Sequence, residues 1–102
     1  MARRTEPPLI PDDGLEGAAK ALKVLAHPHR LRMVELLMER DLSVGELADE
    51  VGLAPAAVSQ HLNNMRAHGI VEPRRRDRQV YYEVTNPNAR NLIGCLRRFG
   101  CG

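Results

Sequence analysis

The sequence contains no tryptophan, one phenylalanine and two tyrosines, so aliphatic side chains have to build its hydrophobic core. It also lacks a run of about 20 apolar residues, which excludes a membrane-spanning helix. Residues 1–11 lack the apolar stretch of a secretory signal. Two cysteines among 102 residues are too few for a disulfide scaffold. We therefore expect a cytoplasmic protein of one domain, with no membrane partner.

Lysine is also scarce, because 13 of the 15 basic residues are arginine. This bias fits a GC-rich genome. It also fits phosphate recognition, because the planar guanidinium binds phosphate in bidentate fashion. The net charge of +2 is unevenly distributed, with −3 over residues 1–57 and +5 over residues 58–102. The basic C-terminal part suits a polyanionic partner, although a solvated basic surface would have the same composition.

Hydrophobic periodicity predicts five helices and one hairpin. Residues 1–12 contain three prolines and are expected to form a flexible arm ahead of one domain over residues 13–102. Ser43 and Glu46 have the spacing of a capping box. Two short helices joined by residues 52–54 and followed by a hairpin predict a winged helix-turn-helix fold, mainly α with a β-hairpin wing (α+β). The predicted helices cover residues 13–26, 28–39, 44–51, 55–69 and 86–99, and the strands cover residues 71–74 and 79–84.

The helix predicted over residues 55–69 has a distinctive polar face. At about 100° per residue, Val58, Leu62 and Met65 share one sector, which we expect to be buried. The opposite sector is short, polar and almost uncharged, and such side chains can read base edges in the major groove. His61 lies between the sectors and could bind a phosphate or hold the helix against its neighbour. The predicted DNA contacts of this helix are Ala56, Ser59, Gln60, His61, Asn63, Asn64 and Arg66.

Four arginines surround the predicted hairpin turn. Like charges at this spacing repel each other and destabilise a turn. Beside a DNA backbone, however, each contact releases condensed counterions. The tip could also enter a narrow A·T-rich minor groove, which attracts arginine. We therefore predict DNA contacts by Arg74, Arg75, Arg76, Arg78 and Gln79, the alternative being a solvated run of charge.

One recognition helix reads too few base pairs for specificity. Pairing about a two-fold axis solves this, with half-sites about one helical turn apart. The first and last predicted helices carry apolar faces that a helix-turn-helix core does not need. The expected partners are therefore a second copy of the chain, as a homodimer, and a pseudo-palindromic double-stranded DNA operator. We assign Leu15, Leu22, Leu92, Leu96 and Phe99 to the dimer interface.

Two other functional classes are alternatives to DNA binding. A winged-helix module that binds protein rather than DNA has the same pattern of elements. The arginine cluster and the polar helix face favour the DNA-binding regulator. No nucleophile–base pair, phosphate loop or metal motif indicates an enzyme.

Four motifs follow one another along the chain: LAHPHRLR at residues 25–32, SVGELA at 43–48, LAPAAVSQHL at 53–62 and RRDRQVYY at 75–82. Together they resemble the ArsR–SmtB family of bacterial repressors over roughly residues 15–99. The resemblance implies a dimeric repressor that an inducer releases from its operator. The usual serine at the entry of the recognition helix is replaced by Ala54 or Ala56, and the wing lacks its usual turn glycine.

The resemblance also bears on the inducer. The family's cysteine metal box is absent, since residues 41–47 read DLSVGEL, and the last helix has no histidine for the family's interfacial zinc site. Cys101 resembles the last-helix cysteine of the sulfide- and persulfide-responsive branch, but Glu35 stands where that branch has a partner cysteine. We expect Cys95 and Cys101 to sense reactive sulfur, a redox signal or arsenite, by thiol modification or metalloid binding. No other cofactor is expected.

The spacing of these cysteines leaves their chemistry open. In a continuous helix Cys95 and Cys101 would lie about 9 Å apart along the axis, beyond the reach of a disulfide. Gly100 could let the tail fold back, or the pair could form across the dimer. Arsenite would need a third ligand, such as one from the other subunit. The alternative is that both cysteines are inert.

Overall fold

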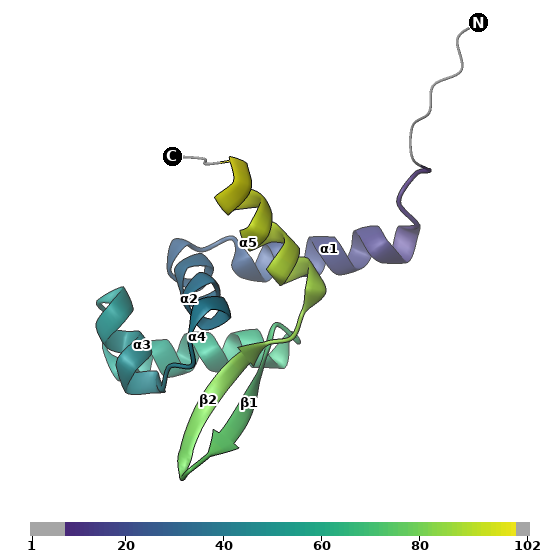
Figure 1. Cartoon of the computed structure of the whole chain (residues 1–102). Helices are drawn as coiled ribbons and strands as arrows, with labels where there is room; N and C mark the ends of the chain where they lie inside the picture. Colours follow the sequence, from purple (N-terminus) through teal and green to yellow (C-terminus); the bar gives the residue numbers. More distant parts are fainter. Residues whose placement is uncertain (1–7, 100–102) are drawn as a thin grey trace, which may run out of the picture.

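The computed structural model describes residues 8–99, and over this range it contains five helices and a two-stranded antiparallel sheet (Figure 1). The helix-turn-helix is followed by the hairpin of the wing, which projects from the helical body. This confirms the predicted winged helix-turn-helix, with element bounds within two residues of expectation. Residues 1–7 of the predicted arm lie outside the described range. The elements are α1 (Asp12–Leu25), α2 (Pro28–Glu39), α3 (Val44–Val51), α4 (Pro55–Ala67), β1 (Val71–Arg76), β2 (Gln79–Val84) and α5 (Pro87–Phe99).

Local capping explains where the helices begin and end. The capping box of α3 is present, since the Glu46 N–H donates to Ser43 Oγ at 3.2 Å and the Ser43 N–H donates to Glu46 Oε1 at 2.9 Å. Gly52 ends α3 in the left-handed conformation, with φ of 73°. Asn86 Oδ1 accepts from two backbone N–H groups of the first turn of α5, at 2.9 and 3.1 Å. These caps satisfy orphan backbone groups at the turns that orient α4 and α5.

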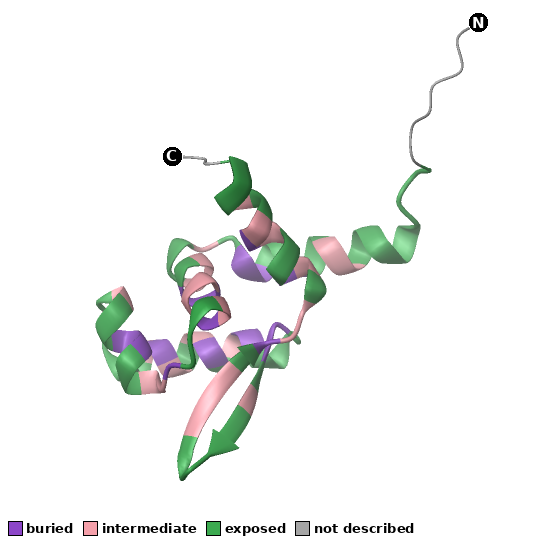
Figure 2. Ribbon diagram, viewed as in Figure 1, coloured by how far each residue is buried: buried purple, intermediate pink, exposed green. Residues whose placement is uncertain are grey.

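One hydrophobic core lies between α2, α4, the end of α1 and the base of the wing. The predicted stripe of Val58, Leu62 and Met65 is buried, which confirms the expected inner face of α4. Figure 2 shows the buried residues concentrated between the helices, while the blade of the wing is mostly exposed. The remaining core residues are Ala21, Val24, Leu25, Met33, Val34, Leu37, Leu42, Leu47, Ala48, Ile70, Val71, Val84, Ala89 and Ile93.

The first and last helices contribute only part of their apolar surface to this core. Leu15 and Leu22 of α1 are 50% and 51% exposed, and Phe99 of α5 is 70% exposed. Leu92 and Leu96 of α5 are half-buried against the core. An apolar surface therefore remains uncovered along α1 and α5. Over residues 8–99, no helix combines the length and the apolarity needed to cross a membrane.

Candidate nucleic-acid interface

The outer face of α4 presents polar and small side chains to solvent. Ala56, Gln60 and Asn63 are exposed, opposite the buried stripe. Ser59 lies on one flank and is half-buried. Asn64 lies on the other flank, where its Oδ1 is buried without a hydrogen-bond partner among the described residues. The arrangement leaves a narrow face, without any charge at its centre, that can approach base edges.

His61 makes a contact that holds α4 against its neighbours. Arg30 of α2 donates from Nε to His61 Nδ1 at 3.1 Å, and from Nη1 to the Val24 carbonyl of α1 at 3.0 Å. One arginine thus joins three helices. Of the two roles expected for His61, this contact corresponds to the structural one. Sequence reasoning missed Arg30, because nothing in its local pattern indicates a partner 31 residues away.

Two further histidines lie beside His61. Its ring centroid is 4.8 Å from that of His27 and 6.3 Å from that of His29. Burial lowers the pKa of His61 below 6.5, and the positive charges of Arg30, His27 and His29 lower it further.

Within residues 8–99, no group of three or more His, Cys, Asp or Glu side chains is arranged to hold a metal ion. His27 also caps α2, since its Nδ1 accepts from the His29 N–H at 3.3 Å.

The wing turns without a glycine. Arg76 pairs with Gln79, so that only Asp77 and Arg78 form the loop, with φ of 48° and 71°. Two consecutive positive φ values are typical of a type I′ turn, which favours Asn or Asp followed by Gly. Arg78 adopts the left-handed conformation despite its Cβ, at a cost of roughly 1–2 kcal/mol. The turn places the Arg78 side chain at the tip of the wing.

Two of the wing arginines are ion-paired within the chain. Arg74 Nε lies 2.8 Å from Glu83 Oε1, and its Nη1 lies 3.2 Å from Glu72 Oε1. Arg76 pairs with Asp41 in the α2–α3 connection. Its guanidinium also lies 4.9 Å from the centroid of the Tyr81 ring.

This pairing divides the four arginines around the turn into two groups. β1 continues to Arg76, and strand alternation puts Arg74 and Arg76 on one face, beside their partners. Arg75 and Arg78 are exposed and make no ion pair with any residue from 8 to 99. Gln79 accepts from the Tyr81 hydroxyl at 3.1 Å. Arg75 and Arg78 are therefore the wing cations available to an external anion.

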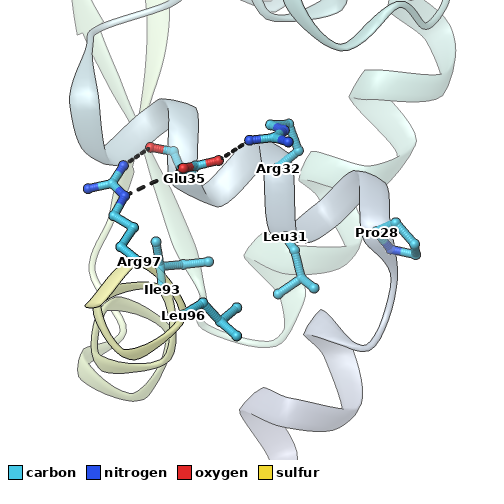
Figure 3. Close-up of a pocket in the computed structure, with 7 residues that line it drawn as sticks. All are labelled: Pro28, Leu31, Arg32, Glu35, Ile93, Leu96 and Arg97. Atoms are coloured by element: carbon cyan, nitrogen blue, oxygen red, sulfur yellow. Dashed lines mark hydrogen bonds and ion pairs between the residues drawn. The ribbon is translucent and has the colours of Figure 1, made fainter. Parts of the chain in front are cut away.

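Ion pairs join α2 and α5 beside the apolar side chains of Leu31, Ile93 and Leu96. Figure 3 shows a groove between these helices, of volume 460 Å³, in which Glu35 lies between Arg32 and Arg97. Arg97 Nε is 3.5 Å from Glu35 Oε2, and its Nη1 is 2.8 Å from Glu39 Oε2. Glu35 stands at the position where, from the resemblance, the sulfide- and persulfide-responsive branch has a cysteine.

The two cysteines themselves are only partly placed. Cys95 is a free, exposed thiol on α5. Its position is three residues after Leu92 and four before Phe99, which puts it beside the uncovered apolar surface. Cys101 lies outside the described residues.

Comparison with known proteins identifies the family. The family described as "Bacterial regulatory protein, arsR family" matches residues 27–73. The biofilm growth-associated repressor of Xylella fastidiosa is 41% identical over 83 residues, which cover 81% of this chain and 73% of that protein. The transcriptional activator HlyU of Vibrio cholerae is 35% identical over 89 residues, covering 84% and 82% of the two chains.

Solved structures agree with these matches. The structure of HlyU from Vibrio cholerae aligns with a TM-score of 0.80 at 32% identity, covering 90% of this chain and all of that one. A homodimeric winged helix-turn-helix DNA-binding domain from Mycobacterium bovis aligns with a TM-score of 0.72 at 26% identity, covering 84% and 80%. These relatives are regulators of transcription rather than enzymes. The chain belongs to the arsR family of bacterial regulatory proteins and is a transcriptional regulator with a DNA-binding winged helix.

Proposed function

We propose that the protein is a homodimeric repressor that binds a pseudo-palindromic operator through α4 and the wing. An inducer sensed by the thiols of Cys95 and Cys101 releases it. The repressor assignment follows the Xylella fastidiosa relative, whose name describes a repressor. HlyU, described as an activator, shows that the direction of regulation differs among relatives.

The observation that carries the DNA-binding mode is the division of α4 into two faces. Its inner stripe is buried, while Gln60 and Asn63 are exposed on the opposite side. Amide side chains can donate to and accept from adenine, so this face suits direct readout. Arg75 and Arg78 of the wing, and Arg66 at the end of α4, make no ion pair with the residues that the structure describes, and they supply cations for backbone phosphates.

Fluorescence anisotropy with labelled duplexes from upstream of the protein's own gene tests this mode. We expect tight, salt-sensitive binding to one duplex and weaker binding to a scrambled one. Gln60→Ala should reduce discrimination at particular base pairs, by about 1–3 kcal/mol for a bidentate contact. A uniform loss over all sequences would contradict readout by Gln60. Absence of sequence-dependent binding by the parent protein would favour a protein-interaction module.

The uncovered apolar surface of α1 and α5 supports dimerisation. Leu15, Leu22 and Phe99 are largely exposed, with half-buried Leu92 and Leu96 beside them. A groove of 240 Å³ between α1 and α5, lined by Leu22 and Leu92 among others, offers a concave seat for a partner side chain. Exposed apolar patches of this kind mark interaction sites, and the Mycobacterium bovis relative is described as homodimeric.

Sedimentation equilibrium tests the dimer. Leu22→Glu and Phe99→Glu should each shift the protein towards monomer, because a carboxylate would be desolvated in the interface. Val80→Glu, which adds the same charge to the wing, should leave the dimer intact. A parent chain that remains monomeric at micromolar concentration would exclude this part of the proposal.

Thiol sensing draws support from the place of Cys95. Its exposed thiol adjoins the proposed interface, so oxidation or metalloid binding would alter how α5 packs against the partner. A shift of α5 would move the two α4 helices away from the spacing of successive major grooves. The inducer has to bind the DNA-free arrangement more tightly, because equal affinity for both states would shift nothing.

Sodium arsenite and inorganic polysulfide are the probes for this step. Each is added to the preformed operator complex, and release is followed by anisotropy. Cys95→Ser and Cys101→Ser should each abolish release by the active probe. A response retained by both variants would favour regulation without thiol sensing. Regulation without thiol sensing is the second candidate function. The ion pairs of Arg97 with Glu35 and Glu39 favour it, because these contacts join α2 to α5 and involve no thiol.

A further inference from the structure

A basic groove lies between α1 and the C-terminal end of α4. The last turns of α1 lie above this end of α4 in Figure 1. The groove has a volume of 600 Å³. Three of the lining residues carry permanent positive charge, one is a histidine and none is acidic. The lining residues are Lys20, Lys23, Val24, Arg30, Asn64, Ala67 and His68.

The cations of this groove are not neutralised by any acidic side chain among residues 8–99. Over residues 8–99, Lys20, Lys23 and Arg30 take part in no ion pair. Arg30 donates to two neutral acceptors, His61 Nδ1 and the Val24 carbonyl, and so keeps its full charge. Like charges gathered around one groove repel each other. An external anion would remove this repulsion, and nothing in the described residues does so.

The groove opens beside the base-reading face of α4. Ala67 follows Gln60 and Asn63 at helical spacing, so that it ends the exposed face and also lines the groove. At about 100° per residue, Asn64 and His68 fall on one flank of α4, opposite the flank that carries Ser59 and Arg66. One flank of the helix therefore offers the cation of Arg66, whereas the other flank adjoins the basic groove.

A helix in the major groove meets phosphates on both sides. Its diameter with side chains is about 10–12 Å, and the major groove of B-DNA is about 12 Å wide. Both flanks of α4 would thus approach a sugar-phosphate backbone when its exposed face meets the bases. Arg66 is available to one backbone. The groove lined by Lys20, Lys23 and His68 is available to the other.

We propose that this groove is a phosphate-binding surface for the DNA strand on the α1 side of α4, with Lys20 and Lys23 as the principal contacts. The proposal rests on the proposed DNA binding and extends it to α1. Arg30 adds charge from the floor of the groove. The contact is independent of sequence, because phosphates carry no base identity.

Salt titrations of the dimer on the operator duplex test the surface. Each substitution removes one contact from each subunit of the dimer. Lys20→Gln and Lys23→Gln should therefore each lower the slope of log K against log[salt] by about 1.8, and weaken binding roughly sixtyfold at 0.1 M salt. Scrambled duplexes should be weakened by the same factor. Arg32→Gln is the matched control, since it removes one charge from an arginine already paired with Glu35. Its slope should equal that of the parent.

Two results would overturn the proposal while leaving the proposed function intact. One is operator binding by Lys20→Gln and Lys23→Gln with the parent slope. The other is a result from NMR titrations that record backbone amide chemical shifts. In it, inorganic phosphate shifts the signals of residues 20, 23 and 68 to saturation, whereas the operator duplex does not shift them. A parent protein without sequence-dependent DNA binding would instead defeat the proposed function itself. Thermal melts of each variant confirm that its fold is intact.

Discussion

The two sides of this molecule use the same kind of cation in opposite ways. On the side of α2, α3 and α5, Arg32, Arg40 and Arg97 are ion-paired, with Glu35, Glu50 and Glu39 among their partners. Arg90 and Arg98 of α5 make no ion pair among residues 8–99; Arg90 donates to the Val84 carbonyl and Arg98 lies over the Phe99 ring. Around α4 the basic residues have no acidic partner within the described range. This second group comprises Lys20, Lys23, Arg30, Arg66, Arg75 and Arg78.

Stability does not account for this division. Exposed ion pairs contribute about 0–1 kcal/mol, so leaving several cations unpaired costs the fold little. The unpaired group instead occupies the tip of the wing, the end of α4 and the adjoining groove. These are the surfaces that a duplex would meet if α4 entered its major groove. The comparison teaches that the cluster of unpaired cations around α4, rather than the net charge of +2, indicates the DNA-binding side.

The largest effect is expected from the two unpaired wing arginines. Removing both in Arg75→Gln/Arg78→Gln should eliminate two phosphate contacts in each subunit, and so four in the dimer. The salt slope should then fall by about 3.6, and operator affinity should fall roughly 4,000-fold at 0.1 M salt. Anisotropy titrations between 50 and 300 mM salt would measure both.

The paired arginines supply the control for the wing. Arg32→Gln/Arg40→Gln removes the same two charges from the opposite group. We expect its slope to match that of the parent. If both double variants lose affinity equally, the pairing of a cation has no bearing on its contact with DNA, and the comparison fails.

Much of this comparison could be predicted from local sequence. The helix periods, the capping box of Ser43 and Glu46 and the hairpin pattern are local signals, and they located the elements within two residues. The inner and outer faces of α4 follow from its spacing alone. The position of the wing could be predicted, but which of its arginines form ion pairs could not.

Contacts between distant segments were out of reach. Asp41 meets Arg76 across 35 residues, and Arg30 meets His61 across 31. Neither pair has a local signature, because a turn of helix or a strand register shows only near neighbours. The sequence likewise indicates that Lys20 is an ordinary exposed helix residue. Only the structure shows that it lines a groove together with residues of α4.

Removing the carboxylate of the Asp41–Arg76 pair would convert Arg76 from an ion-paired cation into an unpaired one. In Asp41→Asn the carboxylate is lost, and with it the ion pair of Arg76, while the contact of Arg76 with the Tyr81 ring remains. The freed guanidinium of each subunit should join the phosphate contacts, steepening the salt slope of the dimer by about 1.8 and strengthening binding roughly sixtyfold at 0.1 M salt. Fold stability should change by less than about 1 kcal/mol, since the pair is exposed.

Arg76→Gln is the companion variant for this test. It should leave the slope near that of the parent, because the pair was already neutral. A weaker affinity in Asp41→Asn would contradict the expectation. It would mean that the pair acts by positioning the wing.

The smallest effect concerns His61, which lies between the two classes because its charge depends on pH. Its pKa in the folded chain is lowered by burial and by the charges of Arg30, His27 and His29, so below pH 6.5 the unfolded chain binds this proton more readily. His61 therefore contributes fully to stability above pH 6.5, and this contribution is lost as the pH falls towards the lowered value. Protonation also places a charge on Nδ1, where Arg30 donates.

His61→Gln keeps an acceptor near Arg30 but cannot be protonated in this range. Urea unfolding of parent and variant from pH 7.5 to 5.5 would measure the difference in their free energies of unfolding. We expect the parent to lose more stability than the variant as the pH falls, because only its folded state resists the added charge. Parallel curves would show that the Arg30 contact tolerates a protonated His61, and that a further unpaired cation on α4 costs the fold nothing.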